Sequence, residues 1–394
     1  MLKRLAIITS HPIQYNAPLF ELLAKRKIID VKVFYTWGKD VLKDKYDPDF
    51  GKVITWDIPL LNGYEFEFLE NVSKDKGSHH FNGIDNPGII DAINNYKPAA
   101  ILVYGWSFKS HLKLMRHFKN KIPLLFRGDS NLLDKTVFIS SLKRTLFLKW
   151  VYRFVDIALY VGKSNYDYFR KAGLTKNQLV FAPHVIDNAR FACEDEKCLG
   201  AAAQFRKILN IPNEDFIFLF AGKLEPKKDP LVLIHAFLQA NFNSTVHLVI
   251  IGNGVLENEL KENYSQKTSI HFLDFQNQLQ MPAVYQMADV FVLPSKGPGE
   301  TWGLSVNEAM ANGKPVVVSD RCGCAADLVE EGINGYTFNA TNTIGLQKKL
   351  ELLYANKNNM AMFMHKSKEK IAAYSLDALA GAIENTVLNI KACV

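Results

Sequence analysis

Short apolar segments rich in β-branched residues recur along the chain and alternate with longer segments of helical periodicity. The first series of apolar segments covers Leu5–Thr9, Val31–Tyr35, Ala100–Tyr104, Ile122–Phe126, Ile157–Val161 and Leu179–Ala182. The second series covers Phe216–Ala221, His247–Gly252, Ile270–Leu273, Val290–Leu293, Val316–Ser319 and Gly335–Phe338. Continuous apolar strands that alternate with helices are typical of parallel sheets covered on both faces. The pattern therefore predicts an α/β protein with two doubly wound, Rossmann-like domains.

A charge cluster at residues 190–197 interrupts the periodicity between the two series, within a predicted seam at Asn188–Leu199. This break predicts a domain boundary, with an N-terminal domain over 1–195 and a C-terminal domain over 196–374. Gly200–Leu209 is expected to form a helix that leads into the second domain. The tail 375–394 has apolar residues near helical spacing and predicts a terminal helix. Two domains also fit the length of 394 residues, which exceeds what one core usually supports.

The composition, with 48% hydrophobic and 22% charged residues, is that of a well-packed soluble protein. No uninterrupted apolar run reaches the ~18 residues that a membrane span needs. The five cysteines are too few and too irregular for a disulfide framework, which favours a reducing cytoplasm. The net charge of +7 fits anionic substrates, an anionic membrane surface or nucleic acid. No helix-turn-helix, RNA signature or zinc finger supports nucleic acid as a partner.

The most informative chemistry follows the predicted strand Val290–Leu293, in the stretch 299–313. Glu300 falls in the loop after the strand, and Glu308 falls inside the next predicted helix. With Gly303 in the first helical turn, backbone N–H groups and the positive end of the helix dipole are suited to a phosphate. Carboxylates beside such a site can accept hydrogen bonds from sugar hydroxyls. This stretch therefore predicts a nucleotide-sugar site.

Glu300 and Glu308 reproduce the Glu-x7-Glu signature of the retaining glycosyltransferases of family four, which this chain resembles. The resemblance extends to Pro294-Ser295, to residues 313–317 and to residues 332–335. It implies the GT-B fold, in which two Rossmann-like domains have a cleft between them. It also implies that the nucleotide sugar binds the C-terminal domain, that the acceptor binds the N-terminal domain, and that the terminal helix crosses back onto the N-terminal domain.

Ligands of open parallel sheets bind beyond the carboxyl ends of the strands, where three predicted loops of the second domain meet. The resemblance implies that Lys223 and Lys228 neutralise the diphosphate. It assigns the ribose hydroxyls to Glu308 and the transferred sugar to Glu300. Trp302 is interpreted as a packing residue rather than a sugar platform. The expected donor-binding residues are Gly222, Lys223, Lys228, Gly252, Asn253, Gly254, Phe275, Glu300, Thr301, Trp302, Gly303, Leu304 and Glu308. The expected catalytic group is Glu300, Lys223, Lys228 and Asp129.

The first domain resembles the family less closely, and its predicted strand exits supply the candidates for the acceptor side. After the first strand, His11, Gln14 and Tyr15 are candidates, although His11 is equally typical of a hydrogen-bonded turn residue. After the strand Ile122–Phe126, Arg127 and Asp129 are candidates, because many relatives place a histidine or an acid there.

Three motifs imitate metal sites without meeting the requirements for one. Cys322-Gly323-Cys324 is interpreted as a turn of small buried residues, since no second ligand pair accompanies it. His79-His80 is expected in a mobile loop, and Asp47-Pro48-Asp49 does not suit the strand-end turn of a metal-binding Asp-x-Asp. The resemblance therefore implies no metal and no cofactor beyond the donor, for which UDP- and GDP-sugars are not distinguished.

Residues 142–154 combine four cations with large apolar residues at helical spacing. This pattern predicts either a helix packed on the sheet with its charges in water, or a helix at a membrane surface.

The resemblance implies a retaining, metal-independent glycosyltransferase that moves a sugar from a nucleoside diphosphate sugar to a hydroxyl of a saccharide or lipid-linked glycan, as in polysaccharide biosynthesis. Retention allows either front-face attack or a covalent intermediate. The alternatives are a nucleotide-sugar epimerase or hydrolase with the same fold, and a regulatory protein that binds nucleotide sugar without turnover. The expected location is the cytoplasm, including the inner face of the membrane.

Overall fold

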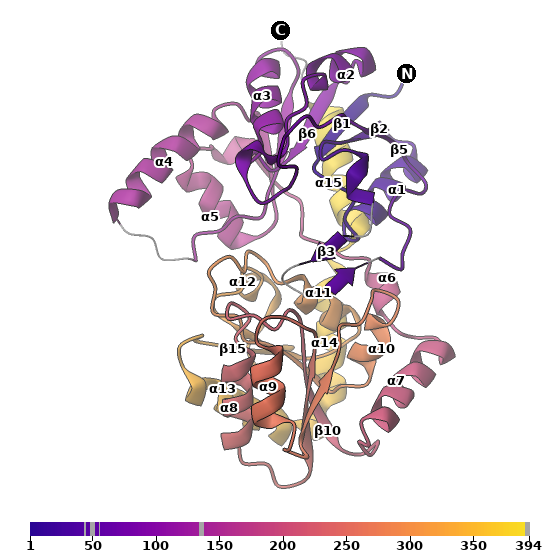
Figure 1. The fold of residues 1–394 in the computed structure, drawn as a ribbon, viewed down its shortest axis with the longest axis vertical. Coiled ribbons are helices and arrows are strands. Elements are labelled where there is room, and N and C mark those ends of the chain that lie inside the picture. The colour runs from indigo at the N-terminus through magenta and orange to yellow at the C-terminus, as the bar shows by residue number, and fades with distance from the viewer. Residues whose placement is uncertain (43–44, 48–51, 55, 134–137, 391–394) are drawn as a thin grey trace. The chain divides into compact units, whose positions relative to one another are not determined.

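The computed structural model divides into two compact units, shown together in Figure 1 and described here separately. It describes residues 1–42, 45–47, 52–54, 56–133 and 138–390. Unit 1 comprises Met1–Lys45, Pro59–His184 and Leu376–Val394, and unit 2 comprises Tyr46–Ile58 and Val185–Ser375.

Unit 1 is built on a seven-stranded parallel sheet with the strand order β5-β2-β1-β6-β7-β8-β9. Its strands are β1 (Arg4–Thr9), β2 (Asp30–Tyr35), β5 (Glu65–Phe68), β6 (Ala100–Tyr104), β7 (Leu124–Arg127), β8 (Ile157–Tyr160) and β9 (Leu179–Phe181). Its helices are α1 (Ala17–Arg26), α2 (Ile89–Tyr96), α3 (Lys109–Phe118), α4 (Phe138–Tyr152), α5 (Lys163–Lys171) and α15 (Leu376–Asn389), with 3-10 turns η1 (Lys39–Leu42), η2 (Phe81–Gly83) and η3 (Lys176–Gln178). Nearly every residue of β1, β6 and β7 is buried, because helices cover both faces of the sheet.

Unit 2 is built on a six-stranded parallel sheet with the strand order β12-β11-β10-β13-β14-β15. Its strands are β10 (Phe216–Ala221), β11 (Val246–Ile251), β12 (Ile270–Leu273), β13 (Val290–Leu293), β14 (Val316–Ser319) and β15 (Gly335–Phe338). Its helices are α6 (Asn188–Phe191), α7 (Glu196–Ile208), α8 (Pro230–Gln239), α9 (Glu257–Tyr264), α10 (Met281–Gln286), α11 (Leu304–Ala311), α12 (Ala325–Leu328), α13 (Thr343–Ala355) and α14 (Met360–Ala372), with the 3-10 turn η4 (Lys357–Asn359). A two-stranded sheet of β3 (Lys45–Asp47) and β4 (Lys52–Ile54) lies at the start of the segment that joins this unit.

In each sheet the chain runs outward in both directions from a central pair of strands. The pair is β1 and β6 in unit 1, and β10 and β13 in unit 2. At such a switch point the loops that leave neighbouring strands turn to opposite faces, and the space between them is the usual ligand position of an open parallel sheet.

All twelve predicted strands are present within a few residues of their expected bounds, and α7 confirms the helix expected at Gly200–Leu209. Strand β5 was not predicted, because its sequence Glu-Phe-Glu-Phe alternates between charged and apolar residues, as an edge strand does, and is not a continuous apolar run. Its two glutamates pair with Lys32 of β2.

The units divide after His184 rather than at the predicted boundary of 195. The charged cluster that suggested this boundary instead begins α7, where Asp195 accepts a hydrogen bond from the Cys198 amide as the N-cap.

The terminal helix α15 belongs to unit 1. Lys3, which precedes β1, donates hydrogen bonds to the carbonyls of Val387 and Leu388 near the helix end. The buried carboxylate of Glu384 lies 3.1 Å from the guanidinium of Arg26 at the end of α1. Burial nonetheless raises the pKa of Glu384, because it outweighs the attraction of Arg26. Among the described residues, no helix has the length and apolar character needed to cross a membrane.

Candidate functional site

The loops that leave β10 and β11 are joined backbone to backbone at the carboxyl edge of unit 2. The amide of Gly222 donates to the carbonyl of Ile251 at 3.0 Å, and the amide of Leu224 donates to that of Asn253 at 2.9 Å. Gly252 has a φ of +139°, and a Cβ placed on it would lie 2.0 Å from the carbonyl oxygen of Gly222. The Gly-x-Gly sequence is therefore required for the two loops to pack, whatever ligand lies beyond them.

Asn253 joins the second loop to the third. Its side chain is fully buried, donates to the carboxylates of Glu257 and Asp274, and accepts from the amide of Phe275. Burial alone would raise the pKa of Glu257, but hydrogen bonds from Lys261 and Asn253 outweigh it, so the net pKa is lowered. The exits of β10, β11 and β12, which carry many of the expected donor-binding residues, thus form one hydrogen-bonded edge.

Lys228 and Glu300 form an ion pair at the switch point of unit 2. Lys228 comes from the loop after β10, and Glu300 comes from the loop after β13. The Nζ of Lys228 lies 2.6 Å from an Oε of Glu300, which is only 8% exposed and also accepts a hydrogen bond from Ser295. Lys223, in the same loop as Lys228, is half-buried. The structure therefore places a cation and a carboxylate, both predicted as site residues, side by side where a ligand is expected.

Helix α11 begins directly after this loop. Its N-cap, Gly303, has a φ of +101°, and a Cβ there would meet the side chain of Leu293 at 2.8 Å. Since glycine offers no capping side chain, the amides of the first turn lack the usual side-chain partner, and their orientation suits an anion. Glu308, in the second turn of α11, is buried and accepts a hydrogen bond of 2.7 Å from the hydroxyl of Tyr285.

Trp302 and the two cysteines after β14 pack beneath the Glu300 loop. The indole of Trp302 is 3% exposed and donates to Asn307, which confirms its interpretation as a packing residue. The amide of Cys324 donates to the carbonyl of Trp302. Both Cys322 and Cys324 are buried, as predicted, and burial raises the pKa of the Cys322 thiol to about 12. These thiols therefore support the loop and stay protonated at neutral pH.

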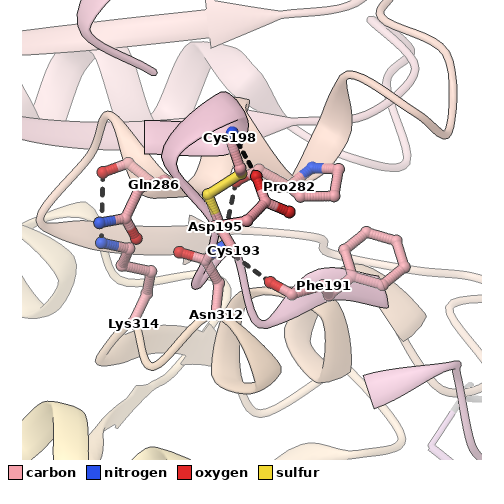
Figure 2. The surroundings of a disulfide bond; sticks show 8 residues. All are labelled: Phe191, Cys193, Asp195, Cys198, Pro282, Gln286, Asn312 and Lys314. Atoms are coloured by element: carbon pink, nitrogen blue, oxygen red, sulfur yellow. Dashed lines mark hydrogen bonds between the residues drawn. A yellow bond between two sulfur atoms is a disulfide. The ribbon is translucent and has the colours of Figure 1, made fainter. Parts of the chain in front are cut away.

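The C-terminal end of α11 is fixed on the segment that enters unit 2, as Figure 2 shows. The side chain of Asn312 donates to the carbonyls of Phe191 and Pro282, at 2.8 and 3.0 Å. Directly after Phe191, a disulfide links Cys193 to Cys198. The number and spacing of the cysteines predicted no disulfide framework, so this pair was not expected. The cysteines flank the N-cap turn of α7, which brings residues five apart to within disulfide distance.

In unit 1, the two acceptor-side candidates at the end of β7 differ in burial and in their partners. The guanidinium of Arg127 is buried and donates to the carbonyls of Ala182 and Pro183 after β9, both at 2.8 Å. Asp129 remains partly exposed, and one of its oxygens lies 3.8 Å from Nε2 of His184. Burial lowers the pKa of His184, although Asp129 opposes the shift. His184 was missed, and the available signal was its position directly after the last apolar segment of the first series.

His11 lies in the turn that follows β1. Its Nδ1 is 2.8 Å from the hydroxyl of Ser10, and its ring contacts Trp37 edge-on at 5.1 Å. This geometry favours the interpretation of His11 as a turn residue. Gln14 and Tyr15 follow in the same turn and are half-buried.

The structure adds a third potential ligand beside His79-His80. Both imidazoles lie near Asp75, and one ligand atom of each of the three residues falls within 4.8 Å of the others. Asp75 and His79 are exposed, as are many acidic surface groups that hold no metal. The other imitation of a metal site, Asp47-Pro48-Asp49, lies outside the described residues apart from the backbone of Asp47 in β3.

Residues 202–370, within unit 2, match the family model described as "Glycosyl transferases group 1". Curated relatives include the Escherichia coli protein "UDP-Gal:alpha-D-GlcNAc-diphosphoundecaprenol alpha-1,3-galactosyltransferase", 35% identical over 145 residues, which cover 35% of each chain. They also include the Campylobacter jejuni protein "N,N'-diacetylbacillosaminyl-diphospho-undecaprenol alpha-1,3-N-acetylgalactosaminyltransferase", 27% identical over 216 residues, or 52% of this chain and 53% of the relative. The alignments thus span between about a third and a half of these relatives.

The fold has a close counterpart among solved structures. Anabaena Alr3699/HepE in complex with UDP superimposes with a TM-score of 0.73 at 17% identity, over 99% of this chain and 100% of the other. This match confirms the predicted GT-B fold, and the family match confirms the resemblance inferred from Glu300 and Glu308.

Proposed function

We propose that this chain, whose residues 202–370 match the glycosyl transferases group 1 family model, transfers a sugar from a nucleoside diphosphate sugar to a hydroxyl acceptor. The donor would bind at the carboxyl edge of unit 2. The single observation that carries this proposal is the ion pair of Lys228 and Glu300 at the switch point, directly before the glycine N-cap of α11. It brings a cation, a carboxylate and a helix N-terminus to the position where an open parallel sheet binds its ligand.

Each group has a role in the proposed reaction. When the bond between the anomeric carbon and the phosphate oxygen breaks, negative charge grows on the diphosphate. Lys223, Lys228 and the first amides of α11 would stabilise that charge, and we therefore propose a reaction that needs no metal ion and no further cofactor. A new bond forms between the anomeric carbon and the acceptor oxygen with retention of configuration, and the acceptor proton leaves with the diphosphate. Glu300 would bind the transferred sugar and Glu308 the ribose.

The acceptor is proposed to be a saccharide or lipid-linked glycan of a polysaccharide pathway. The names of two relatives refer to diphosphoundecaprenol-linked sugars, which supports a lipid-linked acceptor for this chain. Asp129 is the proposed acceptor-side residue of unit 1, assisted by Gln14 and Tyr15. We place the protein in the cytoplasm, with peripheral contact to the inner face of the membrane through residues 142–154.

The donor can be found by thermal denaturation with a panel of UDP-, GDP- and ADP-sugars. A ligand at 100 times its dissociation constant stabilises the folded state by ~2.7 kcal/mol, so one nucleotide should raise the melting temperature clearly above the others. The donor so identified is then incubated with a polyprenyl-diphosphate-linked saccharide, and nucleotide release and product are followed. A melting temperature unchanged by every nucleotide sugar would contradict the proposed site. Donor binding with nucleotide release but no product would point to hydrolysis.

A further inference from the structure

A basic and aromatic hollow lies in unit 1 between α3 and the C-terminal end of α4. Its volume is about 740 Å³. The cationic and polar lining comes from Lys109, Lys113, Arg116, His117 and Arg153, and the apolar lining comes from Phe81, Leu112, Trp150 and Phe154. None of these residues is among the donor-binding or acceptor-side candidates described above.

For three of the cations in the hollow, the described part of the chain offers no carboxylate partner. Lys109 is paired with Asp85 at 2.6 Å, but no ion pair is found for Lys113, Arg116 or Arg153 within the part of the chain that the structure describes. All three side chains are exposed. Like charges held close together without a counter-ion repel one another, and an anion bound among them removes that repulsion. The hollow therefore suits an anionic group.

The aromatic rings of the hollow are covered by cations and by one another. The guanidinium of Arg116 lies 5.8 Å from the ring centre of Trp150, and that of Arg153 lies 5.4 Å from that of Phe154. Phe147 stacks on Trp150, whose ring meets Phe154 edge-on. A sugar platform needs an open ring face, which this arrangement does not favour. A guanidinium that lies over a ring keeps its N–H edge for a phosphate.

An exposed apolar pair lies one turn before Trp150 on α4. Leu146 is 61% exposed and Phe147 is 44% exposed, and Lys143, Arg144 and Lys149 on the same helix are also exposed. Apolar side chains that protrude beside cations are typical of helices that lie in the interface of an anionic membrane. A soluble phosphate compound would explain the cations but would leave this apolar pair without a role.

We infer that the hollow between α3 and α4 binds the phosphate headgroups of anionic lipids, while Leu146 and Phe147 enter the interfacial layer of the membrane. Lys113, Arg116 and Arg153 would contact the headgroups. The inference rests on the proposed membrane contact of residues 142–154. It names anionic lipids as the partner of that contact and adds α3 to the contact surface. Vesicle binding is measured without a donor sugar, so its failure and the failure of the transfer reaction are distinguishable.

The test is co-sedimentation of the full chain with vesicles of equimolar phosphatidylglycerol and phosphatidylcholine, compared with vesicles of phosphatidylcholine alone. We expect binding to the anionic vesicles only, and weaker binding as salt is added. The double variant Lys113→Glu/Arg116→Glu should lower the partition coefficient at least tenfold, since each cation near an anionic surface contributes a factor of about five. The matched control Lys267→Glu/Lys348→Glu makes the same change of charge at exposed positions of unit 2 and should bind nearly as the natural protein does.

Two further arms separate the lipid surface from other anions. Leu146→Ser/Phe147→Ser keeps every charge and should still weaken vesicle binding severalfold, which a site for soluble phosphate would not do. Glycerol 1-phosphate at millimolar concentration should not displace the protein from vesicles. Circular dichroism checks that each variant is folded. Equal binding to neutral and anionic vesicles, unchanged binding after Lys113→Glu/Arg116→Glu, or full displacement by glycerol 1-phosphate would overturn the inference.

Discussion

The switch points of the two sheets are filled in different ways. In unit 2, the exits of β10 and β13 bring together Lys228 and Glu300, two side chains that can also bind a ligand. In unit 1, the buried imidazole of His111 joins the exits of β2 and β6 on either side of β1. It lies 2.9 Å from the hydroxyl of Thr36 and 2.8 Å from the carbonyl of Gly105. Two sheets of similar topology therefore differ in whether charged groups or a neutral core residue occupy the position that favours ligands.

The charge states of the groups at the two switch points differ in the same way. Burial lowers the pKa of His111 to about 4, so this imidazole is neutral at physiological pH and stabilises the loops of unit 1 without attracting an anion. The charged acceptor-side candidates of unit 1 lie farther along the sheet, at the exit of β7. This comparison indicates that shared topology alone does not define a site, and that the chemistry of the side chains at the strand exits does.

The largest effect on stability is expected from Gly252→Ala. This change tests whether the loops after β10 and β11 must be in backbone contact. The new Cβ would clash with the Gly222 carbonyl at 2.0 Å, in a backbone conformation that disfavours alanine. We expect the free energy of unfolding to fall by at least about 3 kcal/mol, measured by urea denaturation. Gly200→Ala, inside α7 with open space around it, is the matched control and should stabilise by about 0.5–1 kcal/mol. Similar effects of both changes would refute the packing argument.

A pH-dependent effect is expected from His111 in unit 1. Its folded pKa of about 4 lies below the value of 6.5 in the unfolded chain, so the unfolded state binds the proton first. Stability should be lost as the pH falls from 6.5 towards 4, by about 3 kcal/mol at most from this residue. His111→Gln should flatten the pH dependence of urea denaturation over this window, even if its stability at pH 7 is lower. The control is His365→Gln, at an exposed position of α14, and an equal flattening there would contradict the role of His111.

Two adjacent lysines of unit 2 are expected to differ in their contribution to nucleoside diphosphate binding, which is a smaller effect. Lys228 is paired with Glu300 at the switch point, whereas Lys227 is paired with Glu225 of its own loop. Lys228→Ala should weaken nucleoside diphosphate binding by about 1.5–3 kcal/mol, the range for hydrogen bonds to charged groups. Lys227→Ala should change it by less than about 0.5 kcal/mol, as expected for a surface site. Isothermal titration calorimetry measures both, and equal losses would mean that net charge rather than position attracts the nucleotide.

Much of this fold was predictable because buried parallel strands leave a strong local signal. Each of the twelve predicted strands is an apolar run bounded by turn residues, and each is present. The edge strand β5 was missed because only one of its sides is paired, so its composition is half charged. The division of the chain after His184 was missed because a charged helix start and a domain linker have similar sequences.

The candidate site of unit 2 was predictable from one continuous stretch, since Glu300, Gly303 and Glu308 lie within nine residues of the sequence. The contacts of this stretch were not predictable. Tyr285, which donates to Glu308, reaches the site from α10 through the packing of that helix, and the bond from Ser295 to Glu300 depends on how their shared loop folds back. The hollow between α3 and α4 likewise joins helices whose separate sequences give no sign of a shared surface.

In the proposed function, unit 2 binds a nucleoside diphosphate sugar through two carboxylates with separate roles. The most direct test is the calorimetric affinity for the bare nucleoside diphosphate, together with kcat and KM, in Glu300→Gln and Glu308→Gln. Glu308→Gln should weaken nucleotide binding by about 1–3 kcal/mol, because a ribose hydroxyl would lose its partner. Glu300→Gln should leave nucleotide affinity nearly unchanged and lower kcat strongly, because the contact proposed for Glu300 is with the transferred sugar. Nucleotide affinity lost in Glu300→Gln while kcat is kept would reverse these roles, and natural kinetics in both variants would contradict the site.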